Sequence, residues 1–336
     1  MASFPRLRLG VSILEAHMMH EVPHIPRPWR TMHTAGDITA LLDLRDIGED
    51  RFRGGHRAHS ILDKTYGGQL FAQSLVAATR TVDPRREVHA VQVACLEAGR
   101  HDQPLDFTVR RNRDGRSFAS RTVEATQQGR VLVQLHASFH VREQGLHHAP
   151  AMPVAPGPDG LPDLFDMMRE HSALPHAAWR REWDGVDLRY VPESLERSRR
   201  EQQGRQQVWI RVGDRLPGDP ALHRQVLAYL SDVTLLNASL LPHGFLIGAP
   251  DLPRATLNHT IWFHDDARAD EWLLVDQHSP WAGGARGLSF AEVFSTDGRH
   301  VASFAQEGLI RPRGDLRREY GWDGPVAGPA DAAADS

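Results

Sequence analysis

The 336-residue chain is long enough for two ordinary domains or for one duplicated domain, and 40% hydrophobic with 24% charged residues is ordinary globular composition. A net charge of −4 gives no general attraction to nucleic acid or to anionic membranes. The single cysteine, Cys95, excludes an intramolecular disulfide and a cysteine-based zinc site, and it fits a reducing compartment. The twenty histidines are scattered without a spacing such as HExxH, so we expect no metal site.

Both ends of the chain are expected to be irregular. Pro23, Pro26 and Pro28 indicate an irregular arm over residues 1–35, which lacks the long apolar stretch and cleavage site of a secretory signal. The last part of residues 316–336 is rich in Gly, Pro, Ala and Asp, which predicts a disordered tail. No apolar run approaches the roughly 20 residues that cross a bilayer. We therefore expect a cytoplasmic protein that binds neither membranes nor nucleic acid.

The first predicted domain covers residues 36–150. Gly67 and Gly68 open an apolar, alanine-rich segment, which predicts a tight turn into a buried helix. The glycines permit close backbone approach, and the first N–H groups of the helix form a positive pole. The same glycines could equally serve only to let a helix lie inside a curved sheet. Short turns then separate strand-like segments, which predicts an α+β domain with an antiparallel sheet: 88–96, 105–111, 118–126 and 131–141.

A linker is predicted over residues 151–203, first rich in Pro and Gly and then highly charged, and a second domain over residues 204–315. In the second domain we expect one long helix from His223 to Gly244, because apolar residues recur at helical spacing and the helix would stop at Gly244. Strands are expected at 207–212, 255–263, 272–278, 287–295 and 300–310.

Asp232 is the unusual residue of this predicted helix. Its neighbours at helical spacing are Ala228, Tyr229, Leu235 and Leu236, which form an apolar wall. A carboxylate in such a place is costly unless it is paired or hydrogen-bonded. Its position alone does not distinguish a structural aspartate from a functional one.

The two predicted domains resemble each other in sequence. GRSFA at Gly115 matches GLSFA at Gly287, and ASF at Ala137 matches ASF at Ala302, with a turn between the members of each pair. The helices keep the same register, so the chain contains two copies of one helix-and-sheet unit.

The copies differ at polar positions inside apolar elements. Asp232 of the second copy corresponds to Gln69 of the first, and Gln306 corresponds to Val141. This asymmetry predicts one specialised site per chain.

Together these segments resemble the acyl-CoA thioesterase II family over roughly residues 36–312. The resemblance implies a tandem, or double, hotdog fold, in which two antiparallel sheets each wrap around a long central helix. The motifs that carry it are YGGQ at Tyr66, RDGRSF at Arg113, ASF at Ala137, QVWIR at Gln207, YLSD at Tyr229, PHG at Pro242, TLNHTIWFH at Thr256, ARG at Ala285 and ASFAQEG at Ala302.

The resemblance also implies an activity and a site. In that family an Asp, a Thr and a Gln bind and orient an attacking water, and the matching positions are Asp232, Thr256 and Gln306. The expected reaction is hydrolysis of fatty acyl-CoA to free fatty acid and CoA, without a cofactor, by a homodimer or homotetramer. Direct attack by water fits the absence of a GxSxG nucleophile motif. Backbone N–H groups near Gly68 and Gln69 are the expected donors to the oxyanion.

Departures from the family leave the substrate preference open. Gln92, Cys95 and Glu97 follow His89 where the family runs through a second histidine and aromatics, and Asn258 replaces a common Asp. These changes could reshape the acyl channel or the approach of CoA.

Two other functions stay open at this point. An enoyl-CoA hydratase of the same fold would use an Asp/His pair, and no pairing of His259 with Asp232 is evident from the sequence. A non-catalytic acyl-CoA-binding module would keep the channel and tolerate loss of the three polar residues. Thiol release from acyl-CoA, compared with water addition to enoyl-CoA, separates these functions.

Overall fold

The computed structural model describes residues 35–56, 60–62, 64–164, 166, 176–246, 248–249 and 252–313. The predicted tail and all but the last residue of the predicted arm lie outside this part of the chain. Among the described helices, none is both long and apolar enough to cross a membrane.

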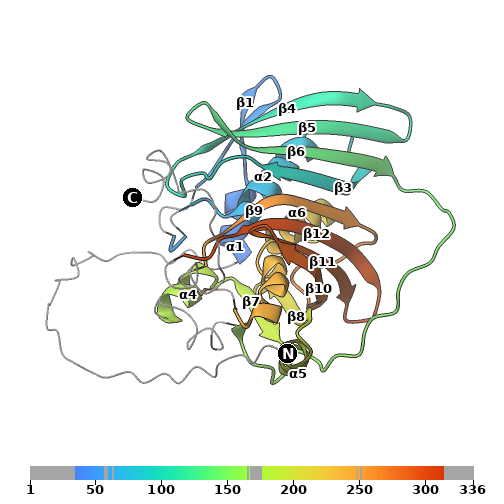
Figure 1. Ribbon diagram of the computed structural model, residues 1–336. Coiled ribbons are helices and arrows are strands. Elements are labelled where there is room, and N and C mark those ends of the chain that lie inside the picture. Colours follow the sequence, from blue (N-terminus) through green and yellow to red (C-terminus); the bar gives the residue numbers. More distant parts are fainter. Residues whose placement is uncertain are drawn as a thin grey trace, which may run out of the picture. The chain divides into compact units, whose positions relative to one another are not determined.

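A helix followed by strands occurs twice along the chain (Figure 1). The first series is α1 (Ala35–Leu42), β1 (Arg45–Gly48), β2 (Arg51–Gly54), α2 (Gly67–Thr79), β3 (Arg86–Cys95), β4 (Leu105–Asp114), β5 (Phe118–Gln127) and β6 (Arg130–Val141). The second is α4 (His176–Glu182), β7 (Val186–Tyr190), α5 (Pro192–Glu201), β8 (Gly204–Val212), α6 (Pro220–Leu230), the 3₁₀ helices η1 (Leu235–Ser239) and η2 (Leu241–His243), β9 (Arg254–Phe263), β10 (Leu273–Gly283), β11 (Arg286–Ser295) and β12 (His300–Ile310).

The described strands form one continuous antiparallel sheet rather than the two sheets expected from the sequence. Its order is β1-β2-β4-β5-β6-β3-β9-β12-β11-β10-β8-β7, so β3 and β9 join the two copies. In this seam Ala90 lies opposite Trp262, and Gln92 lies opposite Thr260. The pairing satisfies backbone groups that each copy would otherwise expose along an edge strand.

Helix α2 begins at the predicted Gly-Gly turn and is buried along most of its length. Phe71, Ala72 and Leu75 have no exposed surface and contribute to the main hydrophobic core. Small residues on this helix let it approach α6, against which it packs. The two helices therefore meet at the centre of the fold.

The long helix expected from His223 to Gly244 is wrong beyond Leu230. Asp219 caps the start of α6 by accepting the Ala221 N–H at 3.0 Å, but the helix ends at Leu230 and two 3₁₀ helices follow. The polar side chains after Leu230 bond to other parts of the protein instead of continuing a helical face, which is how such residues compete with helix geometry. Gly244 ends η2 with a φ of +79°.

The segment expected as a linker, residues 151–203, contains α4, β7 and α5. Strand β7 pairs with β8 and extends the sheet, and its alternate residues Val186, Leu188 and Tyr190 are buried. The pattern VDLRY is an alternation of period two, but it is short and lies between charged segments, which concealed it.

Candidate active site

Asp232 lies just after α6, and its carboxylate accepts three hydrogen bonds. Its Oδ1 accepts the Thr256 hydroxyl at 2.8 Å and the Gln306 amide at 2.7 Å, and its Oδ2 accepts the backbone N–H of Gly68 at 3.1 Å. The three residues identified through the family resemblance therefore meet at one point. The Gly68 donor comes from the first copy, so the cluster is built from both copies of the repeat.

Thr256 and Gln306 are held by neighbouring strands. β9 and β12 are hydrogen-bonded, with Thr256 opposite Gly308. A Cβ on Gly308 would clash with the Leu236 side chain, so the glycine lets η1 pack directly on the sheet. This close packing brings the end of α6, and Asp232 with it, to the two strand residues.

The Gln306 amide has one orientation that fits its neighbours. Its Nε2 donates to Asp232 and also to Thr256 Oγ1 at 2.7 Å, whereas the reverse orientation would press Oε1 against the carboxylate. Gln306 is 2% exposed, and its Oε1 has no partner among the described residues. Ser289, directly opposite Gln306 on β11, likewise has a buried hydroxyl without a described partner.

The surroundings of Asp232 change its acidity. Burial raises the pKa of this carboxyl to about 7, although the hydrogen bonds from Thr256, Gln306 and Gly68 pull the pKa in the opposite direction. A carboxylate with a pKa near neutrality can both take up and release a proton under physiological conditions, which is the property of an efficient general base.

Two glycines make room for this carboxylate at the start of α2. A Cβ on Gly67 would lie 2.5 Å from Asp232 Oδ2, and a Cβ on Gly68 would clash with the Tyr229 carbonyl oxygen. The Tyr66 hydroxyl donates to that same carbonyl at 2.8 Å. The Gly-Gly turn is thus required for the approach of α6 and the carboxylate, and not only for starting a helix.

The expected oxyanion donors at Gly68 and Gln69 both have partners already. The Gly68 N–H binds Asp232, and the Gln69 N–H donates to the Tyr66 carbonyl at 3.1 Å. The Gln69 side chain turns away, with Nε2 at 3.3 Å from Gln73 Oε1. These two amides are therefore not free to bind an oxyanion in this arrangement.

A buried polar network beneath η1 was missed by sequence reasoning. Gln206 Nε2 donates to Gln277 Oε1 at 2.5 Å, and Gln277 Nε2 donates to Thr234 Oγ1 at 2.6 Å. Asn237 donates to Gln206 Oε1 at 2.7 Å and to the Tyr190 hydroxyl at 2.9 Å. The network fixes the segment that directly follows Asp232. The available signal was Gln277 on a predicted strand and Gln206 directly before another.

Cys95 and His259 are neighbours of the site with altered acidity. Burial, with a smaller contribution from the charge of Asp232, raises the pKa of Cys95 to about 12, so its thiol stays protonated. Burial lowers the pKa of His259 to about 3, so its ring is neutral, and it bonds Ser231 Oγ at 2.8 Å. Neither residue is therefore in the charged form that a thiolate nucleophile or an imidazolium acid requires.

Two surface cavities lie away from the carboxylate. One of about 780 Å³ is lined by residues that include Asp46 and Arg111, and one of about 280 Å³ is lined by residues that include Arg286 and Ile310. Asp232 lines neither of them. The hydrogen-bonded geometry, and not the size of a cavity, identifies the site.

Comparison with known families matches both copies. Residues 56–140 match the acyl-CoA thioesterase N-terminal domain, and residues 149–310 match the acyl-CoA thioesterase C-terminal domain. Among curated relatives, acyl-coenzyme A thioesterase 8 of Mus musculus is 33% identical, with 82% of this chain and 88% of that protein covered. Acyl-CoA thioesterase 2 of Haemophilus influenzae is 31% identical, with 82% and 97% covered.

Solved structures agree with this match. An acyl-CoA thioesterase II, TesB2, of Mycobacterium marinum is 41% identical and superposes with a TM-score of 0.69 over 83% of this chain and 99% of that one. A hotdog-fold protein of unknown function from Alicyclobacillus acidocaldarius, 21% identical, has a TM-score of 0.65 over 82% and 98% and supports the fold alone. With both domains matched and relatives above 30% identity covering most of its length, the chain belongs to the acyl-CoA thioesterase family.

Proposed function

We propose that the protein hydrolyses fatty acyl-CoA to a free fatty acid and CoA, with Asp232 as the general base. The observation that carries this proposal is a carboxylate with a pKa of about 7 held by three donors. The names of the relatives supply the substrate class, because they are acyl-CoA thioesterases.

The two oxygens of Asp232 have different roles in this proposal. Oδ1 accepts two hydrogen bonds, from Thr256 and Gln306, and is fully occupied. Oδ2 accepts one, from Gly68, and keeps acceptor capacity for a water. Thr256 and Gln306 therefore orient the carboxylate, and through it the water, instead of holding the water alone.

The reaction then follows from this arrangement. The water bound at Oδ2 attacks the thioester carbonyl carbon while Asp232 takes its proton. The tetrahedral intermediate collapses as the carbon–sulfur bond breaks, and the proton passes from Asp232 to the departing sulfur of CoA. The products are a carboxylic acid and a thiol, and Asp232 returns to its ionised form.

We assign the oxyanion to the backbone N–H of Gly67 in place of Gly68 and Gln69. This amide opens α2 and has no acceptor among the described residues. It lies beside Asp232 Oδ2, since a Cβ on Gly67 would be 2.5 Å from that atom. The positive pole at the helix start favours a developing negative charge at this place.

We also propose that each copy is one hotdog unit, with residues 36–150 and 204–315 as the two units of a double hotdog. The repeat of helix and strands and the pairing of β3 with β9 support this division. The seam then plays the part of a dimer interface within one chain.

Thiol release from a panel of acyl-CoAs, short to long and branched, tests the function. Wild type should release CoA, and Asp232→Asn should lose most of this activity while keeping its circular dichroism spectrum. Parallel incubation with enoyl-CoA, followed by the loss of its double bond, tests the hydratase. Binding of acyl-CoA without either reaction would contradict the proposal and favour a binding module.

A further inference from the structure

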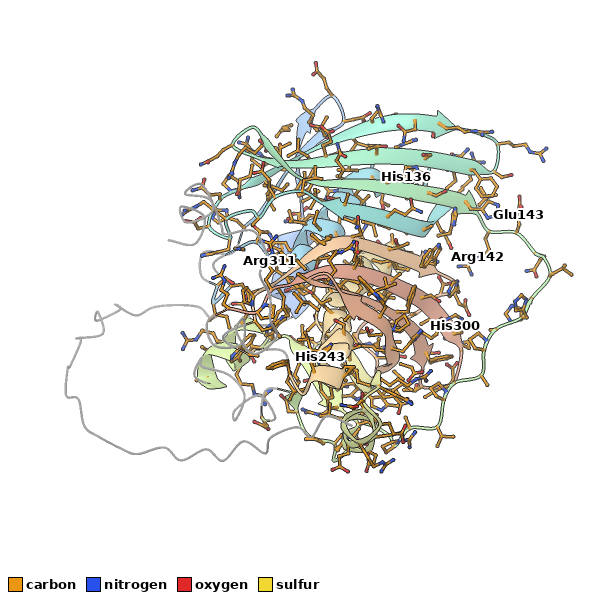
Figure 2. All side chains as sticks on the ribbon, viewed as in Figure 1. His136, Arg142, Glu143, His243, His300 and Arg311 are labelled. Carbon is orange, nitrogen blue, oxygen red and sulfur yellow. The ribbon has the colours of Figure 1, made fainter. Side chains whose placement is uncertain are left out.

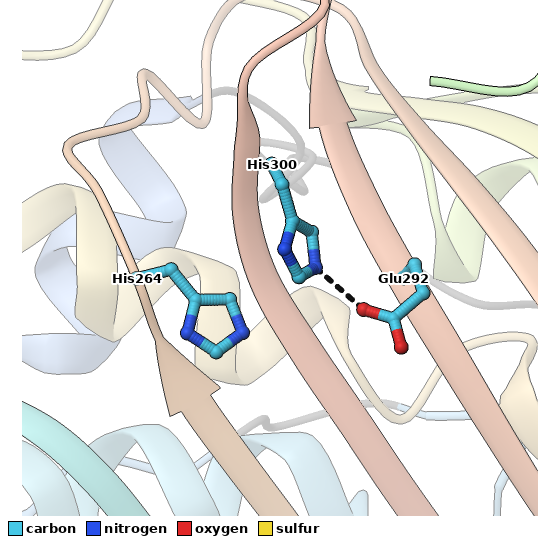
Figure 3. Close-up of side chains that lie close together, drawn as sticks. All are labelled: His264, Glu292 and His300. Carbon is cyan, nitrogen blue, oxygen red and sulfur yellow. Dashed lines mark ion pairs between the residues drawn. The ribbon is translucent and has the colours of Figure 1, made fainter. Parts of the chain in front are cut away.

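Among the residues that the structure describes, a second cluster of chemically active side chains lies on the outer face of the sheet, in the second copy. Glu292 lies on β11, His300 opens β12 and His264 directly follows β9, the strand on the other side of β12. One ligand atom from each lies within 4.8 Å of the others. Figure 3 shows the two imidazole rings and the carboxylate converging, with His300 Nε2 2.5 Å from Glu292 Oε2.

A hydroxyl lies in the middle of this cluster. Ser303 Oγ is 2.9 Å from His264 Nε2, 3.2 Å from His300 Nε2 and 2.5 Å from Glu292 Oε2. A neutral imidazole nitrogen either donates or accepts, depending on its tautomer. The hydroxyl, the two rings and the carboxylate therefore form one hydrogen-bonded cluster around Ser303 Oγ.

The donor set matches one kind of ligand. Two imidazole nitrogens and one carboxylate oxygen are typical of Zn²⁺, which binds nitrogen at about 2.0–2.1 Å and completes a tetrahedron with water. Ligand atoms at the corners of such a tetrahedron are about 3.4 Å apart. The contact between His300 and Glu292 therefore has to open, while His264 moves inward, and its exposed side chain is free to do so.

The first copy provides an internal control for this cluster. Glu292 corresponds to Ser120 in the repeat, and both pair with a serine on the next strand. Ser138, the counterpart of Ser303, bonds His89 at 2.9 Å, and Ser120 bonds His136 at 2.9 Å. The first copy therefore has imidazole and hydroxyl groups here, but a serine stands in place of the carboxylate. Figure 2 shows His136 and His300 well apart on the two copies.

We propose that His264, Glu292 and His300 form a Zn²⁺ site on the outer face of the sheet, with the Ser303 hydroxyl bonded to the ligands. Ser303 and Gln306 are three residues apart on β12 and point to opposite faces of the sheet. The ion is therefore separate from Asp232, and its effect is to tie β9, β11 and β12 together.

Titration calorimetry of the full, tag-free chain with Zn²⁺ tests the site. Wild type should bind one ion with micromolar or tighter affinity. Ser303→Ala should weaken binding by about 10–100-fold, as loss of a group that supports metal ligands does, and His264→Ala should weaken it more. Glu292→Ser introduces the residue that the first copy has at this position, and it should weaken Zn²⁺ binding as much as His264→Ala does.

Control variants and a second readout make the test decisive. His136→Ala, in the first copy, should leave Zn²⁺ affinity unchanged. Co²⁺ should give the intense visible absorption of tetrahedral coordination in wild type but not in His264→Ala, whose exposed position keeps the fold intact. Zn²⁺ should raise the Tm of wild type and of His136→Ala, by mass action, but not that of His264→Ala.

Several outcomes would overturn the site. These are no binding by wild type, equal binding by wild type and His264→Ala, or loss of binding in His136→Ala. In each of these cases the cluster is a hydrogen-bonded ion pair and nothing more. Failure here leaves thiol release untouched, so it is distinguishable from failure of the proposed hydrolase.

Discussion

The two copies use corresponding positions for opposite purposes. In the first copy Gln69 bonds Gln73, and Gln73 donates to the carbonyls of Leu41 and Gly55 at 2.7 and 3.1 Å. In the second copy the corresponding residue is Asp232, whose carboxylate faces donors and keeps acceptor capacity at Oδ2. In the first copy these side chains bond to each other and to backbone carbonyls of the same copy. In the second copy one carboxylate oxygen of Asp232 can still accept a hydrogen bond.

This difference shows that two copies of one fold hold different polar groups at corresponding positions. The first copy still contributes to chemistry, because the Gly68 N–H that holds Asp232 belongs to its helix. The specialised carboxylate and the helix start that binds it thus lie on opposite sides of the β3–β9 seam. The variants below test this difference between the copies by replacing residues of one copy or the other.

Replacement of the base should have the largest effect. Asp232→Ala should lower kcat by about 10²–10⁴, the usual contribution of a positioned acid–base group, as measured by thiol release. Asp276→Asn is the matched control, because burial also raises the pKa of that carboxyl but it lies outside the site. An equal loss of kcat in both variants would contradict the proposal that Asp232 is the general base.

The second-largest loss of kcat is expected when a residue of the first copy, Gly67, is enlarged and presses on the Asp232 carboxylate. A methyl group at Gly67 would meet Asp232 Oδ2 at 2.5 Å, so Gly67→Ala should displace the base and lower kcat by about 10². Gly213→Ala, whose nearest neighbour would be 3.9 Å away, should leave kcat unchanged. Normal turnover in Gly67→Ala would show that the approach of the two copies does not position the base.

Replacing one buried glutamine in each copy, Gln306 and Gln73, compares the two copies directly. Gln306→Ala removes a hydrogen bond to a charged group, so kcat should fall about 10–100-fold. Gln73→Ala removes the side-chain donor to the buried carbonyl of Leu41, which should lower the free energy of unfolding by about 1–3 kcal/mol with kcat unchanged. Denaturant titration and thiol release separate the two outcomes, and a kinetic loss in Gln73→Ala would contradict the division of roles.

The pH dependence should report the carboxylate itself. Because the base must be ionised, kcat/KM should rise with pH around an apparent pKa of about 7, the value of the free enzyme. Thr256→Val removes a hydrogen bond that lowers the pKa of Asp232, so the rising limb should move to higher pH. A limb that stays in place would mean that another group titrates.

Stability should show the same ionisation with a smaller signal. The pKa of Asp232 is raised on folding from 3.8 to about 7, so the native state holds the proton more tightly. This contribution is fully present below pH 3.8 and is lost as the pH rises through 7. The Tm of wild type should therefore fall relative to that of Asp232→Asn between pH 4 and pH 8, and parallel curves would contradict the raised pKa.

Much of the fold could be predicted because its signals are local. Alternating apolar residues and short turns located strands such as β6 and β12, and the Gly67-Gly68 turn located the start of α2. The joining of both copies in one sheet could not be predicted, because pairing such as Ala90 with Trp262 leaves no mark on nearby residues. The early end of α6 depends on bonds to distant partners in the same way.

The residues of the site also differ in whether the nearby sequence predicts them. Asp232 was identifiable as a polar residue among apolar neighbours, and Gln306 by its difference from Val141 in the repeat, while Thr256 depended on the family resemblance. The hydrogen bond from Gly68 to Asp232 joins the two copies, and no pattern in the nearby sequence predicts it. His264 and His300 likewise escaped a search for ligand spacings, because three separate strands bring the cluster together.

The seam between β3 and β9 also has a consequence during synthesis. The pairing strand β9 begins at Arg254, more than 150 residues after β3 ends at Cys95. At about 5–20 residues per second, the ribosome leaves the free edge of β3 waiting on the order of ten seconds for its partner. An unpaired edge strand is a template for association between chains. We therefore expect the nascent first copy to associate with other chains more readily than the completed sheet does.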